Sequence, residues 1–270
     1  MLRFFAVSLL VFSFFSCFKN NAQQKKEEVS NDSAQEADFS LRLNSALANS
    51  KLPENISAKI KQTSADDPAF ILELFSILQT DPYLWVLVDK EHPLGDYEPE
   101  DLVELKNGGS YRVNRNELFL RKEAVAALEE MAADARREGL TLLASSAYRS
   151  AAYQEIVYAR NVREMGQAAA DRESARPGHS QHQLGLIIDF GSITDAFAAT
   201  GEGLWLAANA SRFGWSLSFP DGYEDVTGSR WECWHYRYVG KEIAQFIDNY
   251  FDGIQQYALR FIHEFKEALQ

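Results

Sequence analysis

The segment PGHSQHQLGLIID at residues 177–189 and the segment WECWHYR at residues 231–237 hold most of the chemically active side chains of this chain. His182 and Asp189 belong to the first segment, and His235 belongs to the second. Two imidazoles and one carboxylate, with a fourth coordination position left open, are the ligand set of a catalytic zinc ion in hydrolytic enzymes. We therefore expect the fold to bring His182, Asp189 and His235 together around zinc.

A candidate general base lies beside the second histidine. Glu232 precedes His235 by three residues on what reads as one extended stretch, and could take a proton from a water molecule. A Lewis acid paired with a general base hydrolyses an amide at neutral pH. Each residue also has an ordinary structural reading: a lone histidine is more often a core or surface residue, Asp189 could cap an element and Glu232 could be a solvated charge.

The sequence around these segments alternates signals for short strands and helices. Apolar, β-branched and aromatic runs predict strands at residues 83–89, 140–147, 184–190, 215–219 and 234–240. Helical spacing predicts one or two short helices over residues 41–60 and further helices at residues 69–79, 121–138, 151–166 and 241–268, the last bent near Gly253. Short strands and helices that are mixed along the chain, without a regular strand–helix alternation of long elements, indicate an α+β fold.

Three of the predicted helices carry their own boundary signals. Asp67 followed by Pro68 is typical of a helix N-terminus, with the carboxylate as cap and proline in the first turn. Ser150 is placed to cap the helix that follows it. Gly139 is placed to end the helix before it.

Length and composition exclude several classes of protein. The chain has 270 residues, 46% hydrophobic and 24% charged, which argues against disorder of the whole chain, a collagen-like repeat and a multi-span membrane protein. A net charge of −12 is poorly suited to phosphate backbones, so we expect no nucleic-acid partner. The two cysteines, Cys17 and Cys233, provide no disulfide framework.

The N-terminus reads as an export signal. The run of apolar and serine residues at 4–16 is too short to span a bilayer as a helix and is typical of a signal-peptide core. Cys17 directly after it favours a bacterial lipoprotein signal, with an ordinary secretory signal as the alternative. Because the following residues hold almost nothing apolar, we expect a signal peptide (1–16), a flexible tether (17–39) and one domain (40–270) that begins with a helical extension.

Three motifs occur together in an order found in one peptidase family. The pattern Ser-x-His-x-x-Gly-x-x-x-Asp is met by Ser180, His182, Gly185 and Asp189. The pattern Glu-x-Trp-His-x-Arg-Tyr-Val-Gly is met by Glu232, Trp234, His235, Arg237, Tyr238, Val239 and Gly240. The pattern Ser-x-Tyr-Arg-Ser followed by Gln is met by Ser146, Tyr148, Arg149, Ser150 and Gln154. Over about residues 83–245 the chain resembles the zinc D-alanyl-D-alanine carboxypeptidases related to the vancomycin-resistance peptidases.

The resemblance implies a fold and a metal site. The fold would be the zinc D,D-peptidase or hedgehog-like one, a small α+β domain whose antiparallel sheet with flanking helices carries the site. Zinc would be held by His182, Asp189 and His235. Glu232 would be the catalytic base.

The resemblance also implies how substrate is held. Arg149 would bind the oxyanion or the substrate carboxylate, assisted by Gln154 and Ser180, and a guanidinium suits either anion through paired donors that lysine lacks. The structural alternative for Arg149 is a surface ion pair. Two positions depart from the family pattern: Cys233 stands where proline is common and would place a free thiol near the metal, and Phe219 stands where tyrosine is common.

Together with the lipoprotein signal at Cys17, we expect a lipid-tethered, monomeric enzyme, and the resemblance implies the activity of a zinc carboxypeptidase. It would remove the terminal D-alanine from peptidoglycan stem peptides in the cell envelope, anchored to the membrane at Cys17. An L,D-carboxypeptidase acting on tetrapeptide stems is the alternative within the same chemistry. A non-catalytic cell-wall-binding lipoprotein is the alternative from another class, and the presence of all three ligands and the base disfavours it.

Overall fold

The structure is a computed structural model that describes residues 38–269. The chain divides into two compact units, Met1–Asn44 and Ser45–Gln270, and the second holds all the elements below. The described residues of the first unit are helical. Nearly all of the predicted signal peptide and tether, residues 1–39, lies outside the described residues, so that division stays a prediction. No helix within the described part of the chain is long and apolar enough to cross a membrane.

The centre of the second unit is a five-stranded sheet of order β2-β4-β5-β7-β6. Its strands are β2 (Arg112–Val113), β4 (Leu143–Ser146), β5 (Ile187–Phe190), β7 (His235–Tyr238) and β6 (Trp215–Leu217). Neighbours from β4 to β6 pair antiparallel, and β2 pairs parallel with β4. A second sheet joins β1 (Leu102–Glu104) to β3 (Phe119–Arg121). The predicted α+β class with a small antiparallel sheet is confirmed, with a parallel pair added at the β2 edge.

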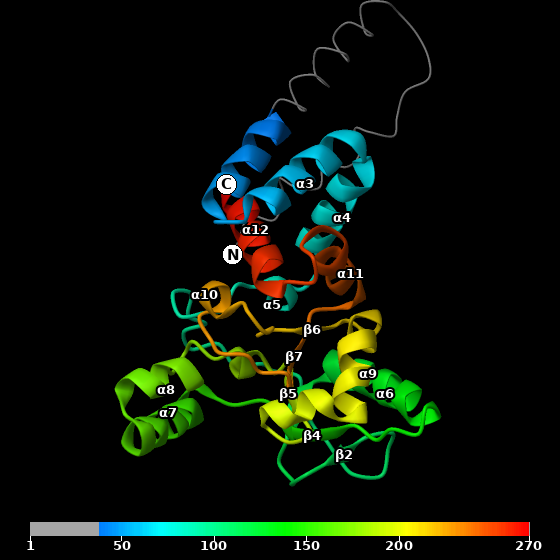
Figure 1. The fold of residues 1–270 in the computed structure, drawn as a ribbon, viewed down its shortest axis with the longest axis vertical. Helices are drawn as coiled ribbons and strands as arrows, with labels where there is room; N and C mark the ends of the chain where they lie inside the picture. Colours follow the sequence, from blue (N-terminus) through cyan, green and yellow to red (C-terminus); the bar gives the residue numbers. More distant parts are fainter. Residues whose placement is uncertain (1–37, 270) are drawn as a thin grey trace, which may run out of the picture. The chain divides into compact units, whose positions relative to one another are not determined.

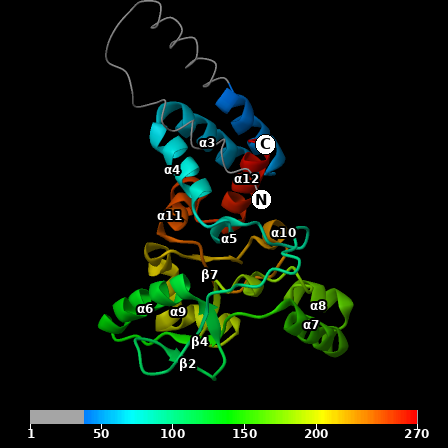
Figure 2. The same ribbon diagram turned by 180° about the vertical axis from the view of Figure 1, so that it is seen from behind.

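Helices lie to both sides of the sheet in Figures 1 and 2. One side carries α6 (Lys122–Arg137) and α9 (Gly201–Asn209), and the other carries the hairpin of α7 (Ala151–Met165) and α8 (Gln167–Glu173). The residues that α6 buries recur with the period of a helix: Ala124, Ala127, Leu128, Met131, Ala132 and Ala135. The helix predicted at residues 121–138 is therefore confirmed, with one face in the core.

A layer of helices packs together at the other end of the same unit (Figure 1). It contains α3 (Glu54–Asp66), α4 (Pro68–Gln79), α11 (Lys241–Tyr250) and α12 (Gln255–Ala268). The fully buried Phe70 ring of α4 has its centroid 5.5 Å from that of Phe246 in α11 and 6.2 Å from that of Phe261 in α12. Segments before residue 80 and after residue 240, which carry no motif, thus stabilise one another through aromatic packing.

Two predicted helix starts are confirmed by their capping contacts. Asp67 Oδ1 accepts a hydrogen bond from the backbone N–H of Ala69 at 2.8 Å, with Pro68 as the first residue of α4. Ser150 Oγ accepts from the backbone N–H of Tyr153 at 3.1 Å, at the start of α7. Local side-chain caps of this kind can be recognised in a sequence because both partners lie within one turn.

The strand predicted at residues 83–89 is wrong. Pro82–Trp85 instead form the short helix α5, and the residues after it pair with no strand. Arg237 Nη2 donates to three backbone carbonyls of this segment, those of Tyr83, Leu84 and Val86, at 3.0, 3.2 and 3.0 Å. A guanidinium reaching over from β7 therefore occupies acceptors that a strand would have used.

The C-terminal region predicted as one bent helix is two helices. α11 and α12 are separated by a turn in which Gly253 has φ +76°, a conformation that glycine adopts without strain. The other predicted strands are present but shorter. Elements that the sequence did not predict are the short strands β1, β2 and β3, the helices α8, α9 and α10 (Glu224–Thr227), and the 3₁₀ helices η1 (Gln181–Leu184), η2 (Asp195–Ala199) and η3 (Ala210–Phe213).

Candidate metal centre and active site

The register of three neighbouring strands builds the centre of the site. In β5 and β7, which run antiparallel, Asp189 stands directly opposite His235. On its other side, Asp189 stands opposite Ser146, the last residue of β4, and the chain continues from there to Arg149. Side chains opposite one another on antiparallel strands have Cβ atoms ~4.5–5.5 Å apart. Strand pairing alone therefore assembles residues that lie far apart in the sequence.

His182 reaches the same place from η1, directly before β5. Ser180 Oγ accepts a hydrogen bond from the backbone N–H of His182 at 3.3 Å and caps this short helix. Gly185 ends it with φ +68°, and a Cβ atom at that position would lie 2.9 Å from Leu102 Cδ2. Both the backbone conformation and the lack of space require glycine there.

The three predicted ligands form one buried cluster. One nitrogen or oxygen atom from each of His182, Asp189 and His235 lies within 4.8 Å of the others. His182 Nε2 is 3.3 Å from Asp189 Oδ2, and His235 Nδ1 is 3.1 Å from Asp189 Oδ1. Asp189 Oδ1 is buried but accepts no well-aligned hydrogen bond. A carboxylate oxygen without a donor, set between two imidazoles, fits a zinc ion that these three residues would hold.

The protonation states of the cluster also fit a metal. His182 Nδ1 lies 2.7 Å from the carbonyl oxygen of Ala147, to which it can only donate, and this leaves Nε2 with its lone pair free. Burial lowers the pKa of His182 to about 4, so the ring is neutral at pH 7. Burial opposes ionisation of Asp189, but the adjoining imidazoles outweigh it and hold its pKa well below the usual range. Metal ligands must be deprotonated, and Nε2 of His182 and the carboxylate of Asp189 already are.

Glu232 lies beside the cluster. Its Oε2 is 3.4 Å from His235 Nδ1, and its side chain is 16% exposed. Burial raises the pKa of Glu232 to about 7, with the Asp189 charge adding to the rise and His235 opposing it. A carboxyl group with a pKa near the working pH can take up and return a proton. A divalent cation in the cluster would favour its carboxylate form.

Arg149 lines the same cavity from the loop between β4 and α7. Its Nη1 donates to Gln154 Oε1 at 2.7 Å and its Nη2 to Ser146 Oγ at 3.3 Å, so no carboxylate holds it in a surface ion pair. Burial lowers the pKa of Arg149. Gln154 donates in turn to the carbonyl oxygen of Ala175 at 2.6 Å and to Ser174 Oγ at 3.2 Å. Gln154 therefore orients the guanidinium, and its role as a direct substrate contact stays a prediction.

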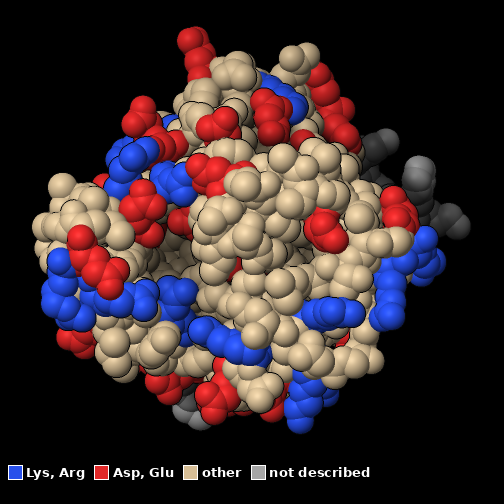
Figure 3. All heavy atoms as spheres, turned by 60° about the horizontal axis from the view of Figure 1, so that its bottom comes forward, with Lys and Arg blue, Asp and Glu red and all other residues tan. Residues whose placement is uncertain are grey.

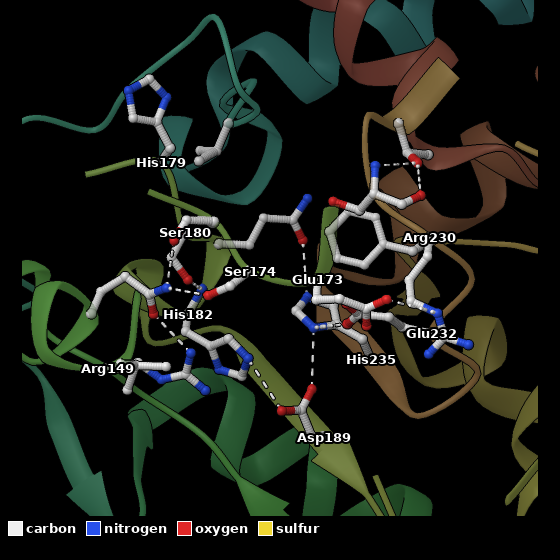
Figure 4. A pocket seen from close by; sticks show the side chains of 18 of the residues that line it. Arg149, Glu173, Ser174, His179, Ser180, His182, Asp189, Arg230, Glu232 and His235 are labelled. Carbon is white, nitrogen blue, oxygen red and sulfur yellow. Dashed lines mark hydrogen bonds and ion pairs between the residues drawn. The ribbon is translucent and has the colours of Figure 1, made fainter. Parts of the chain in front are cut away.

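One cavity of about 300 Å³ holds the whole set of predicted site residues. These are His182, Asp189, His235, Glu232, Arg149, Gln154 and Ser180. Figure 4 shows Arg149 and Ser180 to one side of the ligand cluster, and Glu232 to the other. A group bound at the cluster would thus have a cation on one side and a carboxyl group on the other.

Among the charged cavity residues outside the three sequence motifs, Arg230 and Glu173 lie near Glu232 (Figure 4). Arg230 Nη2 lies 2.6 and 2.7 Å from the two carboxylate oxygens of Asp195, and its Nε lies 3.8 Å from Glu173 Oε1. Glu173 is the last residue of α8, and Figure 4 shows it beside Arg230 and Glu232. The sequence analysis could not identify either residue as part of the site, because the residues that each one contacts lie far from it in the sequence. On the face drawn in Figure 3, acidic and basic side chains are interspersed despite the net charge of −12.

The two departures from the family pattern have different outcomes. The Phe219 ring centroid lies 4.7 Å from that of His235, and Phe219 lines the cavity. Cys233 is a free thiol, as expected, but its sulfur lies 3.7 Å from the carbonyl oxygen of Thr194 and does not line the cavity. The cause is a turn closed by the His235 N–H donating to the Glu232 carbonyl at 3.1 Å, where an extended stretch was expected.

Comparisons with known proteins agree with this geometry. A family model described as VanY, D-alanyl-D-alanine carboxypeptidase, matches residues 117–241. YodJ of Bacillus subtilis, a protein named as a carboxypeptidase, is 33% identical over 220 residues, which cover 75% of this chain and 81% of that protein. A D-alanyl-D-alanine carboxypeptidase of Enterococcus faecalis is 31% identical over 179 residues, which cover 62% of this chain and 63% of that protein.

Solved structures extend the likeness to three dimensions. The LD-carboxypeptidase LdcB is 35% identical with a TM-score of 0.57, over 64% of this chain and 88% of that one. A vancomycin-resistance D,D-pentapeptidase VanY solved in complex with Zn(II) is 29% identical with a TM-score of 0.53, over 70% of this chain and 99% of that one. The zinc cofactor expected from the sequence is thereby confirmed. The chain belongs to the zinc D-alanyl-D-alanine carboxypeptidases of the VanY type.

Proposed function

We propose that this chain removes the terminal D-alanine from peptidoglycan stem peptides that end in D-Ala-D-Ala. The observation that carries the proposal is a single cavity in which the ligand cluster stands between the carboxyl group of Glu232 and the guanidinium of Arg149. The names of relatives support the substrate class, since the E. faecalis relative is a D-alanyl-D-alanine carboxypeptidase and VanYB was solved with D-Ala-D-Ala.

The residues of the cavity divide the reaction between them. When bound, zinc polarises the peptide carbonyl and activates a water molecule for attack. Glu232 is placed to take a proton from that water and to return it to the leaving amine, as a carboxyl group that titrates near pH 7 can do. Arg149 is placed to bind an anion through directional, charge-assisted hydrogen bonds, while Gln154 fixes its orientation.

A specific observation also favours the L,D-carboxypeptidase alternative. LdcB, an LD-carboxypeptidase, is 35% identical to this chain, more than the 30% of VanYB. Both reactions release a terminal D-alanine and use the same cavity chemistry. We favour the D,D reaction because the family model and the E. faecalis relative carry that name. Comparing kcat/KM for pentapeptide and tetrapeptide stems distinguishes the two: faster cleavage of the tetrapeptide would replace our assignment with the alternative.

We expect the free C-terminal carboxylate of the substrate to be essential for efficient cleavage. A hydrogen bond to a charged group contributes about 1.5–3 kcal/mol, so amidation of the substrate C-terminus should lower kcat/KM by roughly 10- to 100-fold. Arg149→Lys should cause a loss of similar size on the free peptide, because lysine cannot reproduce the paired donors. For the Arg149→Lys variant, amidation of the substrate should then lower kcat/KM only slightly further. Equal hydrolysis of amidated and free peptides by the parent protein would instead indicate an endopeptidase, with Arg149 serving the oxyanion alone.

We further propose that the protein is exported and held in the cell envelope as a monomeric lipoprotein. The support is the short apolar run at residues 4–16 directly before Cys17, together with a substrate that is found outside the cytoplasmic membrane. Several acyl chains give stable anchoring where one holds weakly, so a lipidated Cys17 would keep the protein at the membrane. Light scattering of the purified protein tests the monomer.

Replacement of Cys17 by serine is expected to change where the protein is found. The variant should leave the membrane fraction for the soluble fraction, or remain unprocessed with its N-terminal segment attached. Fractionation followed by mass spectrometry of the N-terminus measures both results. A parent protein that is cleaved, soluble and free of lipid would favour the plain secretory signal over the lipoprotein.

A further inference from the structure

A series of buried polar side chains leads away from His235 on the side opposite the ligand cluster. Gln181 Oε1 lies 3.3 Å from His235 Nε2, the ring nitrogen that does not face Asp189. Ser218 Oγ donates to the same Gln181 oxygen at 2.8 Å. His235, Gln181 and Ser218 are 4%, 5% and 2% exposed. Hydrogen bonds this deeply buried are strong, and they are costly to break on one side only.

The series continues into the C-terminal helix. Ser218 Oγ also lies 3.3 Å from Gln255 Oε1, and Gln255 Nε2 donates to the backbone carbonyl of Ser216 at 3.2 Å. Gln255 is the first residue of α12 and is 1% exposed. It lies beyond residues 117–241, the part of the chain that the family model matches. Because the Ser218 hydroxyl has one proton, the oxygens of Gln181 and Gln255 compete for it, and the shorter distance favours Gln181.

His235 has two neutral tautomers, and only one of them can bind a metal through Nδ1. Nδ1 lies 3.1 Å from Asp189 Oδ1 and 3.4 Å from Glu232 Oε2, and although neither contact is a well-aligned hydrogen bond, the charge of carboxylate oxygens this near favours a proton on this nitrogen. A proton there occupies the lone pair that zinc needs. An acceptor at Nε2 favours the other tautomer, since the hydrogen bond of one ring nitrogen decides which nitrogen is free for the metal.

We propose that Gln181 is a positioning residue for zinc: its amide oxygen accepts the Nε2 proton of His235 and so leaves Nδ1 free as the ligand. A carboxamide can present either its oxygen or its NH₂ group, so its orientation must be fixed. Ser218 fixes it by donating its single hydroxyl proton to Oε1, which at 2.8 Å is nearer than the competing Gln255 Oε1 at 3.3 Å. The inference rests on the zinc site of the proposed function, but it concerns metal affinity and not peptide cleavage.

The test is the zinc affinity of the purified protein, measured by competition with a chelator. Gln181→Met keeps similar bulk but removes the strong acceptor, and loss of such a partner typically lowers metal affinity by roughly 10- to 100-fold. Gln181→Glu keeps an acceptor in the same place and should bind zinc at least as tightly as the parent. An affinity of Gln181→Met equal to that of the parent would overturn the proposal. An affinity of Gln181→Glu as low as that of Gln181→Met would also overturn it.

A second readout reports on the tautomer itself. In the zinc-loaded parent, NMR of nitrogen-15-labelled histidine should show His235 protonated at Nε2 and protected from exchange with solvent. Ser218→Ala, which keeps Gln181 but frees its amide to rotate, should weaken zinc binding and reduce that protection, and it carries the test alone if Gln181→Met does not fold. Zinc affinity and protection unchanged in Ser218→Ala would contradict the proposed orientation of the amide.

A matched pair of variants in α12 tests whether Ser218 donates to Gln181 or to Gln255. Gln255 and Gln256 are adjacent and 1% and 3% exposed, but the Nε2 of Gln256 donates to Asp89 at 2.8 Å instead. Gln255→Leu removes the acceptor that competes with Gln181 for the Ser218 proton, so this variant should bind zinc at least as tightly as the parent, and Gln256→Leu should leave the affinity unchanged. A loss of zinc affinity in Gln255→Leu alone would refute the donation from Ser218 to Gln181. If the zinc affinities of all these variants follow the expectations but the parent protein does not cleave stem peptides, the proposed function is refuted and the role of Gln181 is not.

Discussion

Changing His182 or His235 to alanine is expected to reduce the zinc content from one ion per chain to none and to abolish peptide cleavage. Each variant removes one of three protein ligands, and two ligands do not make a catalytic zinc site. The chemistry that zinc supplies cannot be replaced by a side chain of the cavity, so turnover should fall to the level of a blank without protein. Elemental analysis of the purified variants and a cleavage assay on a pentapeptide stem measure both effects.

A histidine outside the cluster provides the control for these two variants. His263 lies in α12, where its ring centroid is 5.2 Å from that of His92, and neither belongs to the ligand cluster. His263→Ala should keep one zinc ion per chain. Full zinc occupancy in a His182→Ala, His235→Ala double variant would end the assignment of these ligands.

Changing Glu232 to glutamine is expected to separate binding from catalysis. Glutamine has nearly the same shape but cannot take the proton from water, and loss of a general base typically lowers the rate by ~10²–10⁴. Glu232 is not among the three grouped ligands, so zinc content should stay at one ion per chain. The affinity for an uncleaved stem peptide should also be retained. Single-turnover kinetics and equilibrium peptide binding measure the two parts independently.

A second acidic residue of the same cavity serves as the matched control. Glu173 lines the cavity, where its Oε1 lies 3.8 Å from Arg230 Nε, and it forms no ion pair with the ligand histidines. Glu173→Gln should therefore keep most of the turnover that Glu232→Gln loses. A Glu232→Gln variant that turns over at the parent rate would show that another group is the base.

The site could be predicted largely from the sequence because its residues sit in compact motifs. His182, Asp189, Glu232 and His235 fall within two short segments, and antiparallel pairing of β5 with β7 places Asp189 opposite His235. The surroundings of the site could not be predicted in this way. Gln181 gains its contact with His235 only when η1 packs against β7, and a glutamine between Ser180 and His182 has no distinctive pattern of its own.

The fold was predictable where the signals were local and unpredictable where they were not. The caps at Asp67 and Ser150 mark helix starts because each bonds within its own first turn. The apolar run at residues 83–89 has the composition of a strand, yet Arg237 binds its carbonyls from the far end of the domain. Burial lowers the pKa of Arg237 to about 9. Its partners are backbone carbonyls, which are neutral and present in every residue, so the pattern of charged residues in the sequence does not identify them.

The central claim is that this chain is a zinc D,D-carboxypeptidase, and mass spectrometry of the products from one defined substrate tests it most directly. The purified zinc-loaded protein should convert a stem pentapeptide ending in D-Ala-D-Ala to the tetrapeptide, releasing a single D-alanine. A chelator should stop the conversion, added zinc should restore it, and Glu232→Gln should lack it. A pentapeptide left intact by the zinc-loaded protein, or cleaved at the same rate with the chelator present, would contradict the account.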